Sequence, residues 1–199
     1  MTTRLIIRGR QDGFTLVELL IVAIILAILA AIVVPQFASS TDDAADAALR
    51  SNLSAIRGAV DLYTQQHGGS FPGAVAATGG TCTGGTAGTG AADSSAALLS
   101  QLQFYTNASG QACSIADIDA DGTPEFPFGP YIKGTIPANP VTSDPTIAIV
   151  TTGNLAMTGV GDSSASPSTA GGWRYDTTSG KFIADDTGPD SNGVAYDAY

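Results

Sequence analysis

The chain has 199 residues, of which 13% are charged, and its formal net charge at pH 7 is −10. It contains eight Lys and Arg residues, and three of them precede residue 13. Because a protein that binds nucleic acid needs a basic face to neutralise phosphates, no such partner is expected. The length suits one globular domain plus an appendage.

The appendage is an apolar run near the N-terminus. Residues 1–13 contain three Arg and one acid, Asp12, and no side chain from Leu19 to Val34 is polar. At about 1.5 Å per residue, residues 14–34 can span a hydrocarbon core about 30 Å thick. The basic flank should stay in the cytoplasm, which places the rest of the chain outside the inner membrane.

One acid, Glu18, lies within the apolar run. A carboxylate in a membrane segment is costly, so a chain that keeps one should have a partner for it. A secretory signal would be cut at a small-x-small site after the run, but this run continues into Pro35 without a convincing site. A plain signal anchor is the alternative, and it leaves Glu18 and the Gly13–Phe14 junction unexplained.

A short basic leader, then Gly13-Phe14-Thr15-Leu16-Val17-Glu18 and a long apolar stretch, resembles the N-terminus of the type IV pilin and type II secretion pseudopilin superfamily. The resemblance implies that a prepilin peptidase cuts after Gly13 and methylates the new amino group of Phe14. It also implies that Glu18 helps to dock each subunit by pairing with the Phe14 amino group of a neighbour.

Pro35 closes the apolar run. Proline removes a backbone donor and crowds the preceding turn, so it either kinks the helix or marks the end of the membrane segment. The resemblance implies that the helix around Pro35 can unwind inside a filament, which makes Pro35 an assembly residue.

An amphipathic helix is predicted for residues 38–67. Leu49, Leu53, Ile56, Val60 and Tyr63 recur at helical spacing on one face, and Gly68-Gly69 ends the pattern. We therefore expect three parts: a leader (1–13), a transmembrane and assembly helix (14–35), and a periplasmic head (36–199) that includes the helix at 38–67.

The head is predicted to be α+β. Residues 73–93, rich in Gly, Ala and Thr, should form a surface loop, and residues 94–105 a short helix capped by Ser94 or Ser95. Residues 146–151 read as a strand, and residues 173–175 and 181–184 as a hairpin. The expected fold is a long N-terminal helix packed on a small antiparallel sheet, as in pilins.

Three C-terminal segments sharpen the resemblance toward the major pseudopilin of type II secretion: G-P-Y-I-K at 129–133, P-A-N-P at 137–140 and G-W-R-Y-D-T-T-S-G at 172–180. The resemblance implies a subunit that polymerises through its apolar helix to drive protein export. A type IV pilus subunit for adhesion, motility or DNA uptake is the alternative. A membrane-anchored binding module that never polymerises is a third, and an enzyme is not expected.

The resemblance also implies partners and a location. The partners would be the prepilin peptidase, identical and minor pseudopilin subunits, and an inner-membrane assembly platform with its ATPase. The chain itself has no phosphate-binding loop. It would lie in the inner membrane as a single-pass protein, with a cytoplasmic N-terminus and a periplasmic head, and then enter a periplasmic or extracellular filament.

The two cysteines, Cys82 and Cys113, are far apart in the sequence, and His67 is the only histidine. Three such residues cannot easily supply the four ligands of a zinc site. In an exported protein they should form one disulfide, and in a reducing compartment they would be two free thiols.

Acidic residues at alternate positions, Asp117, Asp119 and Asp121, precede Gly122 and resemble the start of a calcium loop. Glu125 could add a fourth ligand, but the twelfth position of a full loop is Phe128. The alternative is an acidic turn without metal. Asp162, Asp185 and Asp186 are alternative ligands, since the resemblance implies a calcium site in a C-terminal loop.

Two further features admit a functional interpretation and a structural one. His67 could act as a general base, but the sequence places no nucleophile near it, and a histidine at a helix end often meets exposed carbonyls. Trp173 and Tyr175 could stack on a ligand, although packing within the head is the expected role.

Overall fold

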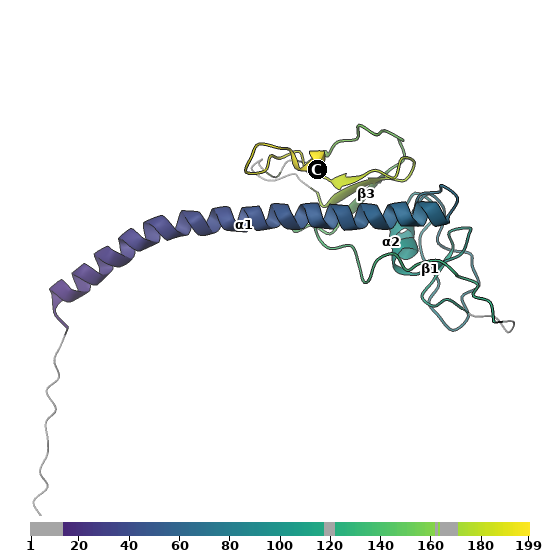
Figure 1. The fold of residues 1–199 in the computed structure, drawn as a ribbon, viewed down its shortest axis with the longest axis horizontal. Helices are drawn as coiled ribbons and strands as arrows, with labels where there is room; N and C mark the ends of the chain where they lie inside the picture. The colour runs from purple at the N-terminus through teal and green to yellow at the C-terminus, as the bar shows by residue number, and fades with distance from the viewer. Residues whose placement is uncertain (1–13, 118–121, 162, 164–170) are drawn as a thin grey trace, which may run out of the picture. The chain divides into compact units, whose positions relative to one another are not determined.

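The structure is a computed structural model that describes residues 14–117, 122–161, 163 and 171–199, with the backbone alone for residues 34–40. The chain divides into two compact units, residues 1–41 and residues 42–199. The second unit contains all but the first six residues of the predicted head, residues 36–199. Figure 1 shows the elements in chain order.

Helix α1 (Leu16–Gln66) has 51 residues and runs through both units. Within the head, the predicted stripe of Leu49, Leu53, Ile56, Val60 and Tyr63 is buried, each residue with at most 3% of its surface exposed. The helix ends just before Gly68 and Gly69, which both have positive φ angles that suit glycine. The predicted amphipathic helix and its end are therefore confirmed.

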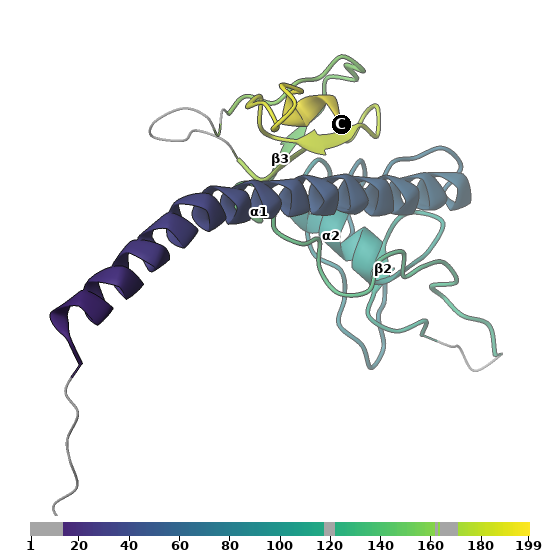
Figure 2. The same ribbon diagram turned by 60° about the vertical axis from the view of Figure 1, so that its left-hand side comes forward.

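Helix α2 (Ser95–Gln103) begins where the sequence predicted. The Ser94 side chain accepts a hydrogen bond from the Ala97 backbone N–H, which confirms Ser94 as the N-cap. Leu98 and Leu102 are fully buried. α2 contacts β3, and Figures 1 and 2 show both elements beside the part of α1 that lies in the head.

The main sheet has three strands in the order β3 (Ile147–Val150), β4 (Trp173–Asp176) and β5 (Phe182–Ala184). The predicted hairpin is confirmed, because β4 and β5 pair antiparallel. β3 pairs parallel with β4, so this sheet is mixed rather than wholly antiparallel. A parallel pair needs a long connection, and residues 151–172 supply it. The α+β fold class is confirmed.

A second, two-stranded sheet joins β1 (Tyr105–Thr106) to β2 (Ala112–Cys113). A 3-10 turn, η1 (Tyr196–Ala198), contacts β5 near the end of the chain.

The core of the head lies where α1, α2 and the β4–β5 hairpin meet. Trp173, Tyr175 and Phe182 are almost fully buried there against the helical leucines. The Trp173 indole N–H donates to the Pro137 carbonyl at 2.9 Å, and the Asn139 side-chain amide donates to the Gly172 carbonyl at 2.9 Å. The P-A-N-P and G-W-R-Y-D segments are therefore in direct contact, and these hydrogen bonds give Asn139 and Trp173 a structural role.

Candidate functional site

The first turn of α1 positions the acid of the apolar run. The Glu18 carboxylate accepts hydrogen bonds from the Thr15 backbone N–H and hydroxyl, both at 2.9 Å. In return, the Glu18 backbone N–H donates to the Thr15 hydroxyl oxygen at 3.2 Å. This is a capping box, in which N-cap and N3 side chains satisfy each other's backbone donors. The T-x-x-E spacing of residues 15–18 is the sequence signature of a capping box, which was not among the predicted features.

The surface of α1 from Leu16 to Val33 is apolar on every side. This stretch has a mean hydropathy of 3.2 and is long and apolar enough to cross a membrane. Its side chains are exposed within the structure. A helix that is hydrophobic all round is stable when lipid or other helices surround it. The segment can therefore serve as a membrane anchor and as a helix-packing surface, with Glu18 as its one acid.

The other predicted N-terminal residues are only partly described. Gly13 lies outside the described residues, and Phe14 immediately precedes the capping box with 82% of its surface exposed. At Pro35 the backbone is helical, and α1 continues to Gln66. The helix therefore does not end at Pro35. Cleavage, methylation, docking through Glu18 and the assembly role of Pro35 remain predictions.

The cysteines form the expected bond. Cys82 and Cys113 are disulfide-bonded, with their Cα atoms 5.6 Å apart. The bond ties the Gly- and Thr-rich loop to β2, and an isolated bridge between Ala87 and Cys113 adds a second link. The alternative of two free thiols is not the state in this structure.

The acidic turn is incomplete in the described part of the chain, because Asp119 and Asp121 lie outside it. The Asp117 carboxylate accepts from the Thr83 backbone N–H at 2.6 Å, and its backbone carbonyl accepts from the Glu125 N–H at 2.9 Å. No group of three His, Cys, Asp or Glu side chains is placed to hold a metal within the described residues. Calcium binding by Asp117, Asp119, Asp121 and Glu125 remains a prediction.

The alternative calcium ligands are differently placed. Asp162 is also outside the described residues. Asp185 forms an ion pair with Arg174, with a shortest distance of 3.0 Å between Nε and Oδ1. One carboxylate oxygen of Asp186 accepts backbone N–H bonds from Ser163 and Gly188. Asp185 thus has an ionic partner, whereas the second oxygen of Asp186, Oδ2, is buried with no hydrogen-bond partner among the described residues.

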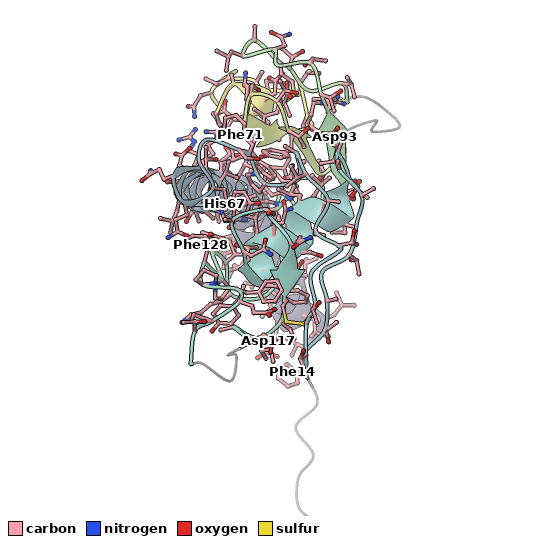
Figure 3. The ribbon with its side chains drawn as sticks, turned by 90° about the vertical axis from the view of Figure 1, so that its right-hand side faces the viewer. Phe14, His67, Phe71, Asp93, Asp117 and Phe128 are labelled. Atoms are coloured by element: carbon pink, nitrogen blue, oxygen red, sulfur yellow. A yellow bond between two sulfur atoms is a disulfide. The ribbon has the colours of Figure 1, made fainter. Side chains whose placement is uncertain are left out.

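His67 is buried at the end of α1. Its Nδ1 lies 2.9 Å from the Tyr63 carbonyl and its Nε2 lies 3.0 Å from the Asn107 carbonyl. The ring stacks on Tyr63 and meets Phe128 edge-on (Figure 3). Burial lowers the pKa of His67 below its ordinary value, and hydrogen bonds to the two carbonyls oppose that shift. Since both ring nitrogens face carbonyls, this geometry favours a structural role over that of a general base.

Trp173 and Tyr175 are fully buried in the core. Burial raises the pKa of the Tyr175 hydroxyl far above its ordinary value. Neither ring is available to stack on a ligand, so the expected packing role is confirmed.

Comparison with known proteins identifies the N-terminal segment. Residues 8–34 match the family model described as the prokaryotic N-terminal methylation motif. The N-terminal segment therefore carries this motif. The match covers the residues on which the resemblance to pilins and pseudopilins rests, and it includes Gly13, Phe14 and Glu18.

Individual relatives match over somewhat more than a quarter of the chain. The chain is 46% identical over 56 residues to type II secretion system core protein G of Pseudomonas aeruginosa, an alignment that covers 28% of this chain and 39% of that protein. It is 43% identical over 54 residues to the core protein G of Klebsiella pneumoniae, covering 27% and 39%. It is 46% identical over 57 residues to the type IV narrow pilus major component PilA5 of Thermus thermophilus, covering 29% and 49%.

The similarity therefore spans less than half the length of each of these relatives. No solved structure gave a significant match.

Proposed function

We propose that this protein is a structural subunit of a type II secretion pseudopilus, which polymerises through its apolar N-terminal helix to drive protein export. The methylation motif at residues 8–34 is the observation that carries the proposal. The similarity to core protein G of two secretion systems supports the choice of filament. The all-round apolar surface of Leu16–Val33 provides the packing surface that polymerisation needs.

The chain would act in three parts. Residues 1–13 form a leader, residues 14–35 the membrane and assembly helix, and residues 36–199 the periplasmic head. A prepilin peptidase removes the leader after Gly13 and methylates the amino group of Phe14. Before cleavage, no charged amine exists at Phe14. The Glu18 carboxylate then accepts hydrogen bonds from the backbone N–H and hydroxyl of Thr15 in the capping box. After cleavage, Glu18 can pair with the Phe14 amine of a neighbouring copy.

Assembly would move each subunit from lipid into the filament. Because lipid tails are as apolar as this helix, moving it from lipid into the filament gains little from the hydrophobic effect, and packing against neighbouring helices replaces the lipid contacts. The packed filament core keeps this surface out of water, where its exposure would cost about 25 cal/mol per Å². The energy for extraction comes from an ATPase that acts through the inner-membrane platform. Identical copies form the shaft together with minor pseudopilins, and the protein itself is not an enzyme.

A type IV pilus subunit is the second candidate. The observation in its favour is the similarity to the pilus component PilA5, which is 46% identical to this chain over 57 residues. In both cases the product is a filament of this chain, so the two candidates differ in where the filament ends and what it moves.

The first experiment determines the mature N-terminus. The full chain is produced with a prepilin peptidase, and the purified product is analysed by mass spectrometry. We expect loss of residues 1–13 and a methyl group on the Phe14 amine. A Gly13→Leu variant should stay uncut, because its side chain obstructs the peptidase. A product that retains the leader, or one cut elsewhere, would refute the prepilin assignment.

The second experiment separates the two filaments. At native expression, surface pili seen by electron microscopy would favour the pilus subunit. Loss of protein export on deletion of the gene, without surface pili, would favour the pseudopilus. Subunits that remain in the membrane fraction in both tests would refute polymerisation and leave an anchored module.

A further inference from the structure

The main sheet has two edges, and the edge formed by β5 is occupied. On that edge, the Phe182 carbonyl accepts a hydrogen bond from the Arg57 side chain at 2.9 Å. The 3-10 turn η1 also contacts β5. An edge that is covered in this way offers few backbone groups to another chain.

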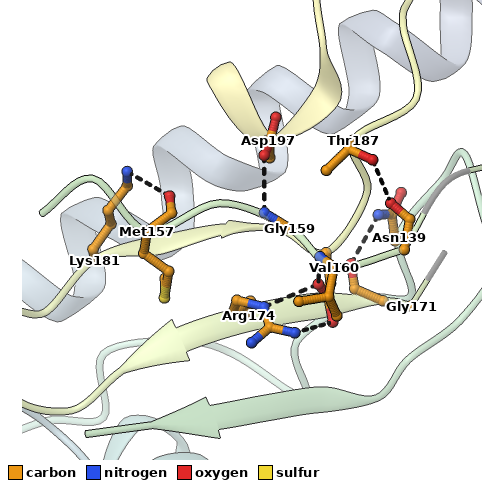
Figure 4. Close-up of polar contacts among 12 residues, drawn as sticks. Asn139, Met157, Gly159, Val160, Gly171, Arg174, Lys181, Thr187 and Asp197 are labelled. Atoms are coloured by element: carbon orange, nitrogen blue, oxygen red, sulfur yellow. Dashed lines mark hydrogen bonds and ion pairs between the residues drawn. The ribbon is translucent and has the colours of Figure 1, made fainter. Parts of the chain in front are cut away.

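β3 forms the other edge, and Figure 4 shows it in green as the outer strand beside β4. On its inner side, the Thr146 carbonyl accepts a hydrogen bond from the Trp173 backbone N–H at 2.9 Å. Successive residues of a strand direct their backbone groups to opposite edges. The N–H and C=O groups of Ile147 and Ile149 therefore face away from β4.

The outer edge of β3 is unpaired within the described part of the chain. Beyond the pairing with β4, no backbone hydrogen bond there reaches Ile147 or Ile149. Both side chains pack against the core, which includes Leu98 and Leu102 of α2. Side chains project from the faces of a sheet, so this packing covers a face of β3 and leaves its edge uncovered. All four residues of β3 are partly exposed.

The unpaired backbone groups determine which kind of partner fits this edge. Two N–H and two C=O groups lie along it, from Ile147 and Ile149. Another extended backbone presents the same groups at the same spacing, as in the recognition of peptides by strand addition. A helix does not, because its backbone groups bond within the helix. The edge therefore fits an extended polypeptide segment.

An apolar groove opens beside the start of β3. It has a volume of about 540 Å³, and its walls include Leu99 of α2, Ile136 and Ile147. None of its lining residues is charged. In strand addition, backbone hydrogen bonds provide affinity and pockets for alternate side chains provide specificity. The groove would select an aliphatic side chain in the added segment.

An acid lies near each end of β3. Before the strand, the Asp144 carboxylate accepts from the Thr146 backbone N–H at 2.8 Å. After it, exposed Asp93 accepts from the Thr177 hydroxyl, and the Thr177 N–H donates to the Val150 carbonyl. Two of the 18 acids and three of the eight bases precede the head, which therefore carries 16 acids and five bases. This charge favours a segment with basic ends and disfavours an acidic one.

A second copy of the chain matches this edge poorly. Apart from residues 4–10 in the leader, no seven consecutive residues contain two bases, and the proposed cleavage removes the leader. Direct pairing of two β3 strands would bring the Asp144 end of one copy beside the Asp144 or Asp93 end of the other. Like charges placed opposite each other destabilise such a pair.

We propose that the outer edge of β3 binds an extended segment of another protein, with aliphatic residues at alternate positions and basic residues at its ends. The inference goes beyond the proposed function. It gives the head a binding activity that does not require the chain to polymerise.

The test measures amide hydrogen exchange by NMR in the full chain, held in detergent micelles. The probe is a synthetic peptide, Lys-Thr-Val-Thr-Val-Thr-Lys, with blocked ends. At about ten times its Kd, the amides of Ile147 and Ile149 should exchange about tenfold more slowly. The amides of Ala148 and Val150, which face β4, should change little. Unchanged exchange at Ile147 and Ile149 across the titration would overturn the proposal.

Two altered peptides separate strand pairing from charge attraction. N-methylation of every central residue keeps the charge but removes the N–H donors, so the protection should disappear. Glutamate in place of both lysines keeps the donors but reverses the charge, so binding should weaken. Equal protection by the N-methylated peptide would show attraction by charge alone and overturn the proposal.

Variants of the head test the basic ends of the partner. The double variant Asp93→Asn/Asp144→Asn keeps side-chain acceptors for Thr177 and Thr146 but removes both charges. It should bind the lysine peptide about fivefold more weakly. Asp61→Asn removes one charge from α1 and should leave the affinity unchanged. Unchanged affinity in the double variant would overturn the assignment of a basic partner.

A titration of the chain without peptide tests the alternative occupant. Protection of Ile147 and Ile149 that rises with protein concentration would assign the edge to a second copy and overturn the proposal. Filaments are scored separately by electron microscopy, and peptide binding without filaments would refute polymerisation while supporting this edge as a binding site. Unchanged fluorescence of Trp173, which lies in the core, verifies that each variant is folded.

Discussion

Thr15 and Glu18 bond reciprocally across the first turn of α1, so the acid of the apolar run has a partner within its own chain. Before cleavage, this pairing supplies hydrogen-bond donors to the Glu18 carboxylate. It also offers two explanations of Glu18 that differ in charge: a helix cap needs only an acceptor, whereas an ion pair with a neighbour needs an anion.

Glu18→Gln separates these explanations, since glutamine can still accept from the Thr15 N–H but carries no charge. If Glu18 pairs with a neighbour's Phe14 amine, both Glu18→Gln and Glu18→Ala should lose filaments, as counted by electron microscopy. Thr15→Val removes only the capping hydroxyl, which costs about 1 kcal/mol of helix stability, and should retain filaments. Normal filaments from Glu18→Gln would contradict the ion pair with a neighbour and support helix capping as the role of Glu18.

Gly180, in the hairpin turn, should resist substitution more strongly than Gly193, although both have positive φ. A Cβ at Gly180 would overlap the Phe71 ring, whereas one at Gly193 would meet open space. Gly193→Ala should cost about 1 kcal/mol of unfolding free energy through backbone strain alone. Gly180→Ala should cost roughly 1–3 kcal/mol more.

Urea unfolding followed by Trp173 fluorescence provides the measurement for both glycine variants. Adding Phe71→Leu to Gly180→Ala should recover part of the loss, because a smaller side chain leaves room for the new methyl group. Equal costs at the two glycines would contradict the packing explanation.

Removal of the disulfide should destabilise the head. Cys82 and Cys113 are 31 residues apart in the sequence, and for a loop of that size the expected loss is about 2–4 kcal/mol. The Cys82→Ala/Cys113→Ala double variant is compared with the oxidised chain by urea unfolding. A reductant should destabilise the original chain by a similar amount and leave the double variant unaffected. An insensitive original chain would show that the bond contributes little.

The stability of the head should depend on the protonation of His67. Burial lowers its pKa, so the unfolded chain binds the proton more tightly than the folded one. The contribution of His67 is present above the unfolded pKa of about 6.5 and is lost as pH falls through the lower folded value. Between pH 7 and pH 5, the unfolding free energy of the original chain should fall more steeply than that of His67→Gln. Parallel profiles would contradict this assignment.

Local sequence patterns predicted the helical part of the fold. The stripe from Leu49 to Tyr63 reads directly as one helix face, and the Ser94 cap and the glycine pair after α1 are short-range signals. The disulfide was also predictable, because the chain has only two cysteines. The hairpin of β4 and β5 followed from aromatic runs around a turn.

Long-range pairing could not be read in this way. The parallel alignment of β3 with β4 depends on how residues 151–172 return to the sheet, and no local pattern encodes that. The ion pair of Arg174 with Asp185 is likewise set by the hairpin that brings the two side chains together. Lys181 appears in the sequence as an ordinary surface cation, yet it binds the carbonyls of Leu155 and Met157.

The Cys82–Cys113 bond also makes the chain a reporter of its own topology. Both cysteines belong to the head, and the apolar segment contains none. Disulfides form in oxidising compartments and not in the cytosol. If the head is exported as proposed, the fraction of chains whose thiols resist alkylation in intact cells should count the heads that have crossed the membrane, without any fused tag.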